Sequence, residues 1–304
     1  MAAFRTNKNG IMTSPATVPS AIQFDISAKH NGRTYRIYVH MPDQAAPQRG
    51  YPVLYVMDGS YFFCAAAMQA KFLAAEYGPL LVVGIGYPSF QNKDVDVMRV
   101  MDFTSAAPEG ELTKGVAKYM ETELQTERIA YGGCEEFFGF IKNELEPTLA
   151  AMYHTDRNNI SIFGYSLGGL FCLYTLFHYP SAFRSFAAGS PSIWWNDKQV
   201  IQALPVMRQS VESGQVSPRV LITVGSLEQS TDRVPTPRFM ARERVEALVR
   251  DVRAIDNARE LAADLMAIRG KNKYSVEFHM FEGETHGSAV GATISRVISF
   301  VLRG

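Results

Sequence analysis

A serine stands between closely spaced glycines in Gly164-Tyr165-Ser166-Leu167-Gly168, after a run of strand-forming residues and before an amphipathic segment. A Gly-x-Ser-x-Gly sequence in that setting is typical of a nucleophile elbow, a sharp strand-to-helix turn that projects the serine hydroxyl from the end of a sheet. The turn is so tight that we expect a Cβ at Gly164 or Gly168 to meet neighbouring backbone. The chemistry that this pattern indicates is nucleophilic attack by Ser166 on an acyl carbon.

A serine hydroxyl is a weak nucleophile at neutral pH, so such a site requires a general base. Among the six histidines, His286 lies in Gly-Glu-Thr-His-Gly-Ser, directly after the last expected strand and before the last expected helix. That is the place of the base when the catalytic residues follow one another in the order Ser, acid, His. The other histidines occur inside the same strand, in the first hairpin or near helix ends. His286 is therefore the predicted base.

The acid should follow the strand expected at 219–225, where Glu228 comes first and Asp232 second. We favour Glu228 because it lies close to the end of the strand, where it could accept the far imidazole proton and hold the productive tautomer. Asp232, and a Glu228 that is merely a solvated loop carboxylate, stay open as alternatives. Glu284 is too close to His286 in sequence to be the natural partner, but it is kept as a further candidate.

An oxyanion hole needs two main-chain N–H groups aimed at the position where negative charge develops. The N–H of Leu167, directly after the candidate nucleophile, is one expected donor. The second should come from the loop after the third strand, Asp58-Gly59-Ser60-Tyr61. We favour the N–H of Ser60, because Gly59 lets the backbone approach closely.

The elements that must position these residues alternate along the chain. Two strand-like runs, 21–28 and 33–42, flank the turn signal Asn31-Gly32 and predict an antiparallel hairpin. Helices alternate with further expected strands at 52–59, 80–88, 159–164, 184–190, 219–225 and 274–281; one long helix is expected over 240–268 and one kinked at Pro147. The fold class is therefore α/β: a mostly parallel, twisted sheet of about eight strands with an N-terminal antiparallel hairpin and helices on both faces. In such sheets the reactive groups gather at the carboxyl ends of the strands.

Three segments differ in organisation. Residues 1–20 are polar and rich in Ser, Thr and Pro, which predicts a flexible lead-in. No repeat or linker divides the rest, so residues 21–304 are expected to form a single domain. Residues 89–131 break the alternation with frequent charge, Gly and Pro, so we expect a lid or substrate loop there.

The composition excludes several classes of protein. The 304 residues carry 30 Lys and Arg against 30 Asp and Glu, so the chain has neither the basic footprint of a nucleic-acid-binding protein nor a polybasic membrane anchor. No signal-peptide-like or membrane-spanning run is found, and we expect a cytoplasmic monomer or homodimer, or a periplasmic protein if a signal was removed. Cys64, Cys134 and Cys172 form no CxxC pair. Neither a metal nor a cofactor is predicted.

Several motifs resemble one known family when taken in order: MDG, RVMDFTS, YGGCEEFFGFIKNELEP, GYSLGG, GSPSIWW and FEGETHGS. Over roughly residues 20–302 the chain resembles the esterase-D-like group of α/β hydrolases, and within it the ferric-siderophore esterases of the enterobactin and bacillibactin type. The resemblance implies an α/β-hydrolase fold, Ser166 and His286 as the catalytic pair, and an acidic third member on the Glu228 loop. Some members of this branch rely on a Ser–His dyad. The resemblance further implies hydrolysis of ester bonds in a tri-ester siderophore or its iron complex.

Two segments depart from this branch. Residues 99–105 lack the proline that is usual there, and Cys134 follows Gly132 and Gly133 where alanine is usual. Both segments border the expected substrate cleft, and we count Gly133 among the candidate substrate contacts. The departures therefore bear on which substrate is bound more than on the chemistry.

Other candidate contacts have a structural alternative. Arg99 could bind a carboxylate or an anionic catecholate, or it could pair with Asp94, Asp96 or Asp102. Trp194 and Trp195 follow the sixth strand on the catalytic side of the sheet and could form a wall for a flat acyl group, although core packing is expected for at least one of them.

Together these residues predict a serine carboxylic-ester hydrolase that forms an acyl-enzyme on a small-molecule ester, with a siderophore as the implied substrate. A general carboxylesterase on another acyl substrate is the nearest alternative. An acyltransferase, in which an alcohol or thiol replaces water, would use the same residues. A non-catalytic binding protein on a hydrolase scaffold is disfavoured, because Ser166, His286 and an acid are all present.

Overall fold

The computed structural model describes residues 5–6, 12–13, 16–89, 92–107, 130–231 and 241–303. Within the expected lead-in, 1–20, it contains a short antiparallel pair, β1 (Arg5–Thr6) and β2 (Met12–Thr13). The rest of that segment up to residue 15 lies outside the described residues, and so does Asp232. The flexible lead-in stays a prediction.

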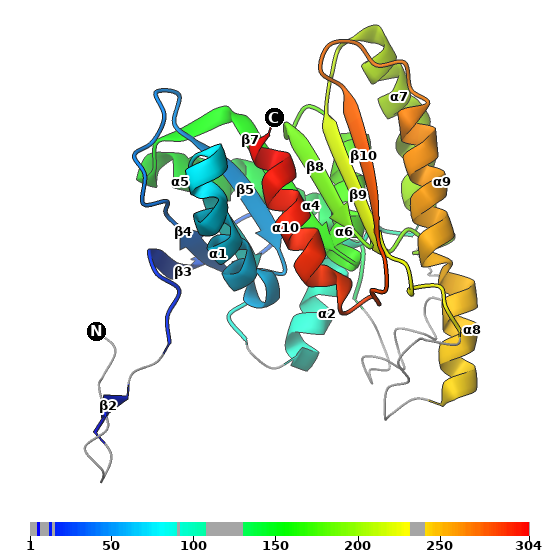
Figure 1. Ribbon diagram of the computed structural model, residues 1–304, viewed down its shortest axis with the longest axis horizontal. Coiled ribbons are helices and arrows are strands. Elements are labelled where there is room, and N and C mark those ends of the chain that lie inside the picture. Colours follow the sequence, from blue (N-terminus) through cyan, green and yellow to red (C-terminus); the bar gives the residue numbers. More distant parts are fainter. Residues whose placement is uncertain are drawn as a thin grey trace.

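One sheet of eight strands organises the described part of the chain, in the order β10-β9-β8-β7-β5-β6-β4-β3 (Figure 1). Its strands are β3 (Ala21–Ser27), β4 (Thr34–His40), β5 (Tyr51–Met57), β6 (Leu81–Gly86), β7 (Thr155–Tyr165), β8 (Ser185–Gly189), β9 (Arg219–Gly225) and β10 (Ser275–Phe281). The hairpin β3–β4 is antiparallel, β4 pairs antiparallel with β6, and all other neighbours are parallel. The expected eight-stranded, mostly parallel sheet with an antiparallel hairpin is confirmed.

Helices cover both faces of this sheet, as expected (Figure 1). They are α1 (Gly59–Tyr77), α2 (Asn92–Phe103), α4 (Cys134–Phe140), α5 (Glu146–Met152), α6 (Leu167–His178), α7 (Leu204–Ser213), α8 (Arg242–Val252), α9 (Ala254–Met266) and α10 (Ala289–Leu302). Two short helices join them: the π-helical turn η1 (Ile141–Leu145) between α4 and α5, and the 3-10 turn η2 (Gln199–Ala203) before α7.

The core lies in two layers, one on each face of the sheet. Along β5 the side chains alternate: Val53, Tyr55 and Met57 join the layer under α2, α4, α6, α7 and α9, whereas Leu54 and Val56 join the layer under α1 and α10. All five side chains are buried. A parallel strand covered on both faces must be apolar at every position, which explains the continuous apolar runs in the sequence.

Two expected helices differ in detail. The helix expected over 240–268 is broken at Arg253, whose φ of 45° is left-handed, so that α8 and α9 are separate helices. The irregularity expected at Pro147 lies one turn earlier, at η1. Proline has no N–H to donate to the carbonyl four residues before it, and the wider π-helical turn lies directly ahead of it.

Part of the expected lid, 89–131, is a packed helix. Residues 92–103 form α2, and its Val95, Val100 and Phe103 are buried in the layer that also contains α4 and α6. Residues 108–129 lie outside the described residues, so a lid there stays a prediction. None of the helices in the described ranges is both long enough and apolar enough to cross a membrane.

Candidate active site

The turn at Ser166 has the geometry of a nucleophile elbow. Ser166 stands between the end of β7 and the start of α6 with φ 59° and ψ −117°, a backbone conformation that costs free energy in any residue but glycine. A Cβ at Gly164 would lie 2.1 Å from the carbonyl oxygen of Gly168, so that position requires glycine. A Cβ at Gly168 would instead meet the Asp58 and Met57 side chains at 3.3 Å, and the expectation of a backbone contact there was wrong.

The segment after β8 holds the elbow in place. The N–H of Ser166 donates to the carbonyl of Gly189 (2.9 Å), and the N–H of Ser192 donates to the carbonyl of Ser166 (3.1 Å). The Oγ of Ser166 lies 3.4 Å from the Oγ of Ser192. Among the described side chains, Ser192 is thus the hydrogen-bond partner of the candidate nucleophile, and a rotation about its Cα–Cβ bond would turn the hydroxyl elsewhere.

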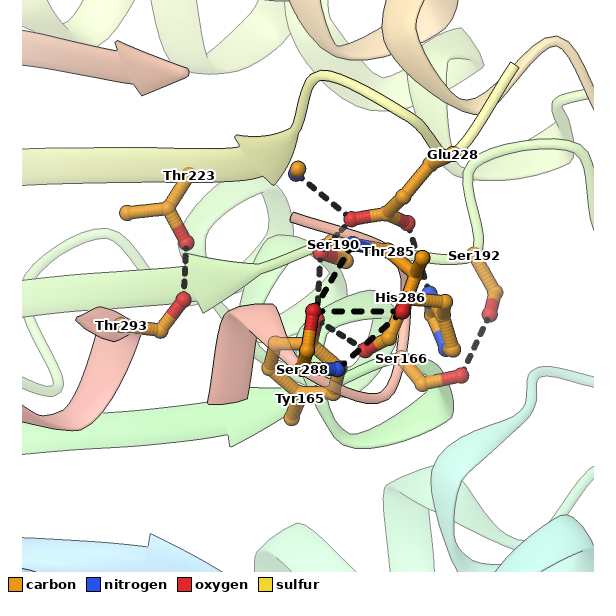
Figure 2. A network of polar contacts seen from close by, with 11 residues as sticks. Tyr165, Ser166, Ser190, Ser192, Thr223, Glu228, Thr285, His286, Ser288 and Thr293 are labelled. Atoms are coloured by element: carbon orange, nitrogen blue, oxygen red, sulfur yellow. Dashed lines mark hydrogen bonds and ion pairs between the residues drawn. The ribbon is translucent and has the colours of Figure 1, made fainter. Parts of the chain in front are cut away.

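His286 and Glu228 form a hydrogen-bonded pair at the same edge of the sheet (Figure 2). His286 lies between β10 and α10 with its side chain 53% exposed, and Glu228 follows β9 with its side chain 1% exposed. The Nδ1 of His286 is 2.7 Å from Oε2 of Glu228. With Nδ1–H donating to the carboxylate, the other ring nitrogen, Nε2, is free to accept a proton.

The second carboxylate oxygen of Glu228 is also occupied. Its Oε1 accepts hydrogen bonds from the N–H of Gly225 (2.7 Å) and from the hydroxyl of Ser190 (2.6 Å). Burial of a carboxylate is costly unless donors replace the lost water, and with His286 this one has three. Gly225 must be glycine, because a Cβ there would lie 2.4 Å from the carbonyl oxygen of Glu284.

Tyr165 joins the elbow to the histidine loop, the segment 282–288 between β10 and α10 that carries His286. The sequence analysis did not identify this role of Tyr165. Its hydroxyl donates to the main-chain carbonyl of His286 (2.6 Å) and lies 2.8 Å from Oγ of Ser190. The Tyr165 and His286 rings are in contact, with centroids 5.2 Å apart. Because Tyr165 directly precedes Ser166, these contacts bring His286 to the elbow, and in Figure 2 the imidazole lies between Glu228 and Ser166.

Two helix N-termini meet beside Ser166. Leu167 is the first residue of α6, and Ser60 is the second residue of α1. The N–H groups of Tyr61 and Phe62 donate to the carbonyl of Asp58, whereas those of Gly59 and Ser60 come earlier and have no acceptor within the helix. The close approach of Asp58 to Gly168 puts the start of α1 next to the start of α6. Both expected oxyanion donors are therefore at one edge of the sheet.

A family model described as "Putative esterase" matches residues 28–257 of this chain. The chain belongs to this esterase family. It is similar to the ferri-bacillibactin esterase BesA of Bacillus subtilis, with 30% identity over 299 residues that cover 97% of this chain and 93% of the relative. It is also similar to the siderophore triacetylfusarinine C esterase of Aspergillus fumigatus, with 29% identity over 303 residues and 94% of each chain covered.

Among solved structures, the esterase resembles the BES protein from Bacillus cereus, with a TM-score of 0.77, 28% identity, and coverage of 96% of this chain and 99% of that one. The siderophore hydrolase EstA from Aspergillus nidulans gives a TM-score of 0.78 at 26% identity, with 93% and 94% covered. The α/β-hydrolase fold and the esterase class implied by the sequence resemblance are confirmed.

Arg99 of the esterase is paired, but with a partner that the sequence did not suggest. Its Nε and Nη2 donate to the two carboxylate oxygens of Asp58 at 2.9 and 2.8 Å, and the Asp58 side chain is completely buried. Burial works against the charge of Arg99, but the carboxylates of Asp58 and Asp96 outweigh it and keep the pKa of Arg99 above its usual value. The ion pair that was expected as an alternative to substrate binding is therefore formed, but with Asp58 and not with Asp94, Asp96 or Asp102. Contact with a substrate stays a prediction.

The remaining candidate contacts are divided between core and surface. Trp195 is buried and belongs to the core, whereas Trp194 is half-buried, and their ring centroids are 6.3 Å apart. A Cβ on Gly133 would meet the side chains of Arg33 and Glu136 at 3.0 and 3.1 Å, so this glycine packs against their ion pair. In the described ranges no group of His, Cys, Asp or Glu is arranged to hold a metal ion.

Proposed function

We propose that this esterase hydrolyses the ester bonds of a siderophore or of its ferric complex, with Ser166 as nucleophile, His286 as general base and Glu228 as the acid that orients it. The observation that carries the proposal is the 2.7 Å bond between His286 and the buried Glu228 beside the strained turn of Ser166. The substrate class is taken from the similarity to esterases named for ferri-bacillibactin and triacetylfusarinine C.

The first half-reaction transfers the acyl group to the enzyme. Ser166 turns from Ser192 to Nε2 of His286, its proton moves to Nε2, and Oγ forms a bond to the ester carbonyl carbon. The C=O electron pair moves to the oxygen, and Glu228 stabilises the imidazolium. The imidazolium then gives its proton to the leaving alkoxide oxygen as the C–O bond breaks, which releases the alcohol.

Water completes the second half-reaction by the same route. His286 takes a proton from water, the hydroxide oxygen adds to the acyl carbon, and the proton returns to Oγ of Ser166 as the acyl bond breaks. The sum is one ester and one water converted to one acid and one alcohol. In a ferric complex the iron is part of the substrate.

The N–H groups of Leu167 and Ser60 are the proposed donors to the oxyanion in both half-reactions. Each such donor contributes about 3–4 kcal/mol of transition-state stabilisation. Because both lie at helix N-termini, where unpaired N–H groups carry partial positive charge, the helices α1 and α6 add to the attraction.

For the acyl group, Trp194 is the preferred contact. It is half-buried, whereas Trp195 is buried in the core and the guanidinium of Arg99 is bound by Asp58. A large aromatic side chain at the carboxyl edge of the sheet offers contact area to a flat acyl group. Arg99 and Gly133 are retained as secondary candidates near the same edge.

Labelling with a fluorophosphonate probe tests the nucleophile. We expect one adduct, located on Ser166 by peptide mass spectrometry, and none in the Ser166→Ala variant. Ser192→Ala is the matched control, because Ser192 is the neighbouring hydroxyl, and this variant should still be labelled on Ser166. An adduct on Ser192, or undiminished esterase activity in Ser166→Ala, would contradict the assignment.

Substrate competition tests the substrate class. We expect kcat/KM for ferri-bacillibactin or ferric triacetylfusarinine C to exceed that for p-nitrophenyl acetate at least about tenfold, a difference of ~1.4 kcal/mol in transition-state stabilisation. A preference for the simple ester would make the protein a general carboxylesterase. Formation of a new ester when an acceptor alcohol is added would make it an acyltransferase.

A further inference from the structure

The orientation of His286 cannot come from burial. Its side chain is 53% exposed, and it stands on the loop that joins β10 to α10. A half-exposed side chain on a loop has several rotamers open to it unless specific contacts select one. Within the described part of the chain, the contacts that hold His286 are the hydrogen bond from Nδ1 to Glu228, the hydrogen bond from Tyr165 to the main-chain carbonyl of His286, and the ring contact with Tyr165.

Ser190 connects the two groups that hold His286. Its Oγ lies 2.6 Å from Oε1 of Glu228 and 2.8 Å from Oη of Tyr165 (Figure 2). The residue is 4% exposed, and its N–H donates to the carbonyl of Thr223 (2.8 Å). Its φ of 38° is left-handed, a conformation that serine adopts rarely. The backbone is therefore held in a strained form that presents the hydroxyl to both partners.

The hydrogens in this network can be counted. Tyr165 and Ser190 supply two hydroxyl hydrogens for three short contacts. The carbonyl of His286 can only accept, so the hydrogen of Tyr165 is committed to it. The single hydrogen of Ser190 then has two acceptors within reach, Oε1 of Glu228 and Oη of Tyr165. Donation to Glu228 lowers the basicity of the carboxylate, and donation to Tyr165 strengthens the bond that Tyr165 makes to His286.

We propose that Tyr165 and Ser190 are positioning residues that fix the main chain of His286 and the carboxylate of Glu228 relative to Ser166. Tyr165 anchors the histidine loop to the elbow, and Ser190 anchors Tyr165 to the acid. The hydrogen bonds of these two hydroxyls go to the main-chain carbonyl of His286, to each other and to Glu228, and not to Ser166 or the imidazole nitrogens. The inference rests on the proposed function, in which His286 is the base.

Removal of the two hydroxyls tests the inference. In Tyr165→Phe the ring is kept, and we expect kcat to fall about 10- to 100-fold with KM nearly unchanged, because a misplaced base slows the proton transfer and not binding. In Ser190→Ala the carboxylate loses a donor and pairs more strongly with the imidazolium, so the acidic limb of the kcat/KM profile should move to higher pH. Ser190→Gly removes the same hydroxyl at a φ that glycine adopts easily, so it serves if the alanine variant fails to fold.

The matched control is Thr293→Val. The hydroxyl of Thr293 shares a buried hydrogen bond of 3.0 Å with the hydroxyl of Thr223, whose carbonyl accepts the N–H of Ser190. It should lose stability, as any buried hydroxyl partner does, while kcat and the pH profile stay at wild-type values. Equal kinetic losses in Thr293→Val and Tyr165→Phe, or wild-type kinetics in both Tyr165→Phe and Ser190→Ala, would overturn the inference.

A second readout does not depend on any substrate. The Nδ1 proton of His286, shared with Glu228, should give a downfield proton resonance in the wild type that broadens in Tyr165→Phe and Ser190→Ala and persists in Thr293→Val. If the resonance changes in these variants as expected while Ser166→Ala keeps its activity, the proposed function fails, but the positioning of His286 by Tyr165 and Ser190 stands. If the resonance is unchanged in every variant while Ser166→Ala is inactive, the positioning fails alone.

Discussion

At the scale of single residues, Glu228 is held through both of its carboxylate oxygens. Oε1 accepts two donors, from Gly225 and Ser190, and Oε2 faces His286. The two oxygens are therefore not equivalent, and the carboxylate cannot turn over without breaking all three hydrogen bonds. If glutamine replaces Glu228, its amide has a donor end and an acceptor end. Only one orientation then keeps an oxygen opposite the donors Gly225 and Ser190.

The variant Glu228→Gln exploits this asymmetry. Its amide oxygen should stay where Gly225 and Ser190 donate, so the NH2 group faces Nδ1 of His286. Nδ1 must then accept, and the imidazole proton moves to Nε2, the nitrogen that has to take the proton of Ser166. We expect kcat on p-nitrophenyl acetate to fall on the order of 10³- to 10⁴-fold with little change in KM, measured by steady-state kinetics.

Two comparison variants address the other acids that the sequence left open. Glu284→Gln and Asp232→Asn should each keep kcat within about twofold of the wild type. Loss of activity in Asp232→Asn with retention in Glu228→Gln would move the role of the acid to Asp232. Retention in all three would leave a Ser166–His286 dyad.

The pairing of His286 with Glu228 could be predicted because each residue follows a strand, and parallel strands end at a common edge. Tyr165 and Ser190 could not be assigned in this way. The partners that give them a role lie 121 and 38 residues away in the chain, at His286 and Glu228. A tyrosine and a serine at buried strand ends are compatible with many partners, and only the folded register selects these.

At the scale of elements, the two glycines of the elbow between β7 and α6 differ in how much space they leave for a Cβ atom. Added Cβ atoms have very different surroundings: 2.1 Å from a carbonyl oxygen at Gly164, 3.3 Å from side chains at Gly168, and open space at Gly291 in α10. Backbone cannot move aside without displacing the strand or the helix, whereas side chains can yield by a few tenths of an ångström.

Alanine substitutions at these three glycines should therefore form a graded series. Gly164→Ala is expected to lose at least about 3 kcal/mol of the free energy of unfolding, or to yield no soluble protein. Gly168→Ala should be affected less. Gly291→Ala should be neutral or stabilising by up to about 1 kcal/mol, because alanine favours an exposed helical position. Urea denaturation measures all three, and equal midpoints for Gly164→Ala and Gly291→Ala would contradict the elbow geometry.

Strands were easier to predict than helix ends. Continuous apolar runs mark strands that are buried on both faces. All eight strands of the large sheet, the outer ones included, were expected from the sequence. The break at Arg253 has no glycine or proline to announce it, since an arginine adopts the left-handed conformation there. The bond between Arg99 of α2 and Asp58 before α1 joins segments 41 residues apart, so local spacing pointed to nearer aspartates instead.

At the scale of the whole molecule, Asp102 is a buried junction. It accepts bonds from Arg33 before β4, Tyr35 in β4 and Tyr87 after β6, while it belongs to α2 itself. Its side chain is completely buried. Burial raises the pKa of Asp102 from 3.8 to about 6, although Arg33 and the two tyrosine hydroxyls act in the opposite direction.

This pKa predicts a pH dependence of stability. Between pH 4 and 6 the folded state keeps the Asp102 proton more often than the unfolded state does, so this group makes the free energy of unfolding fall as pH rises. The slope is at most about 1.4 kcal/mol per pH unit. It should be absent in Asp102→Asn, which urea denaturation of both proteins at several pH values would measure. Parallel curves for the two proteins would refute the assignment.

An oppositely shifted carboxylate serves as the comparison. The hydrogen bond from Arg36 lowers the pKa of Asp25, so the stability that this pair contributes is present above pH 4 and is lost as pH falls. The difference between the wild type and Asp25→Asn should therefore be flat between about pH 5 and 6 and shrink at lower pH. A change of this difference with pH between about pH 5 and 6 would show that the pH dependence of stability in that range is not set by Asp102.

The order of the sheet has a consequence for how this enzyme would fail on heating. β10 is an edge strand of the sheet, with β9 as its hydrogen-bonded neighbour and largely half-buried side chains, and the loop after it carries His286. Margins of a sheet fray sooner than its centre. On heating, catalytic turnover should therefore be lost while the amides of the central strands are still protected from deuterium exchange. Inactivation would then reflect local unfolding of one edge strand and not global unfolding of the protein.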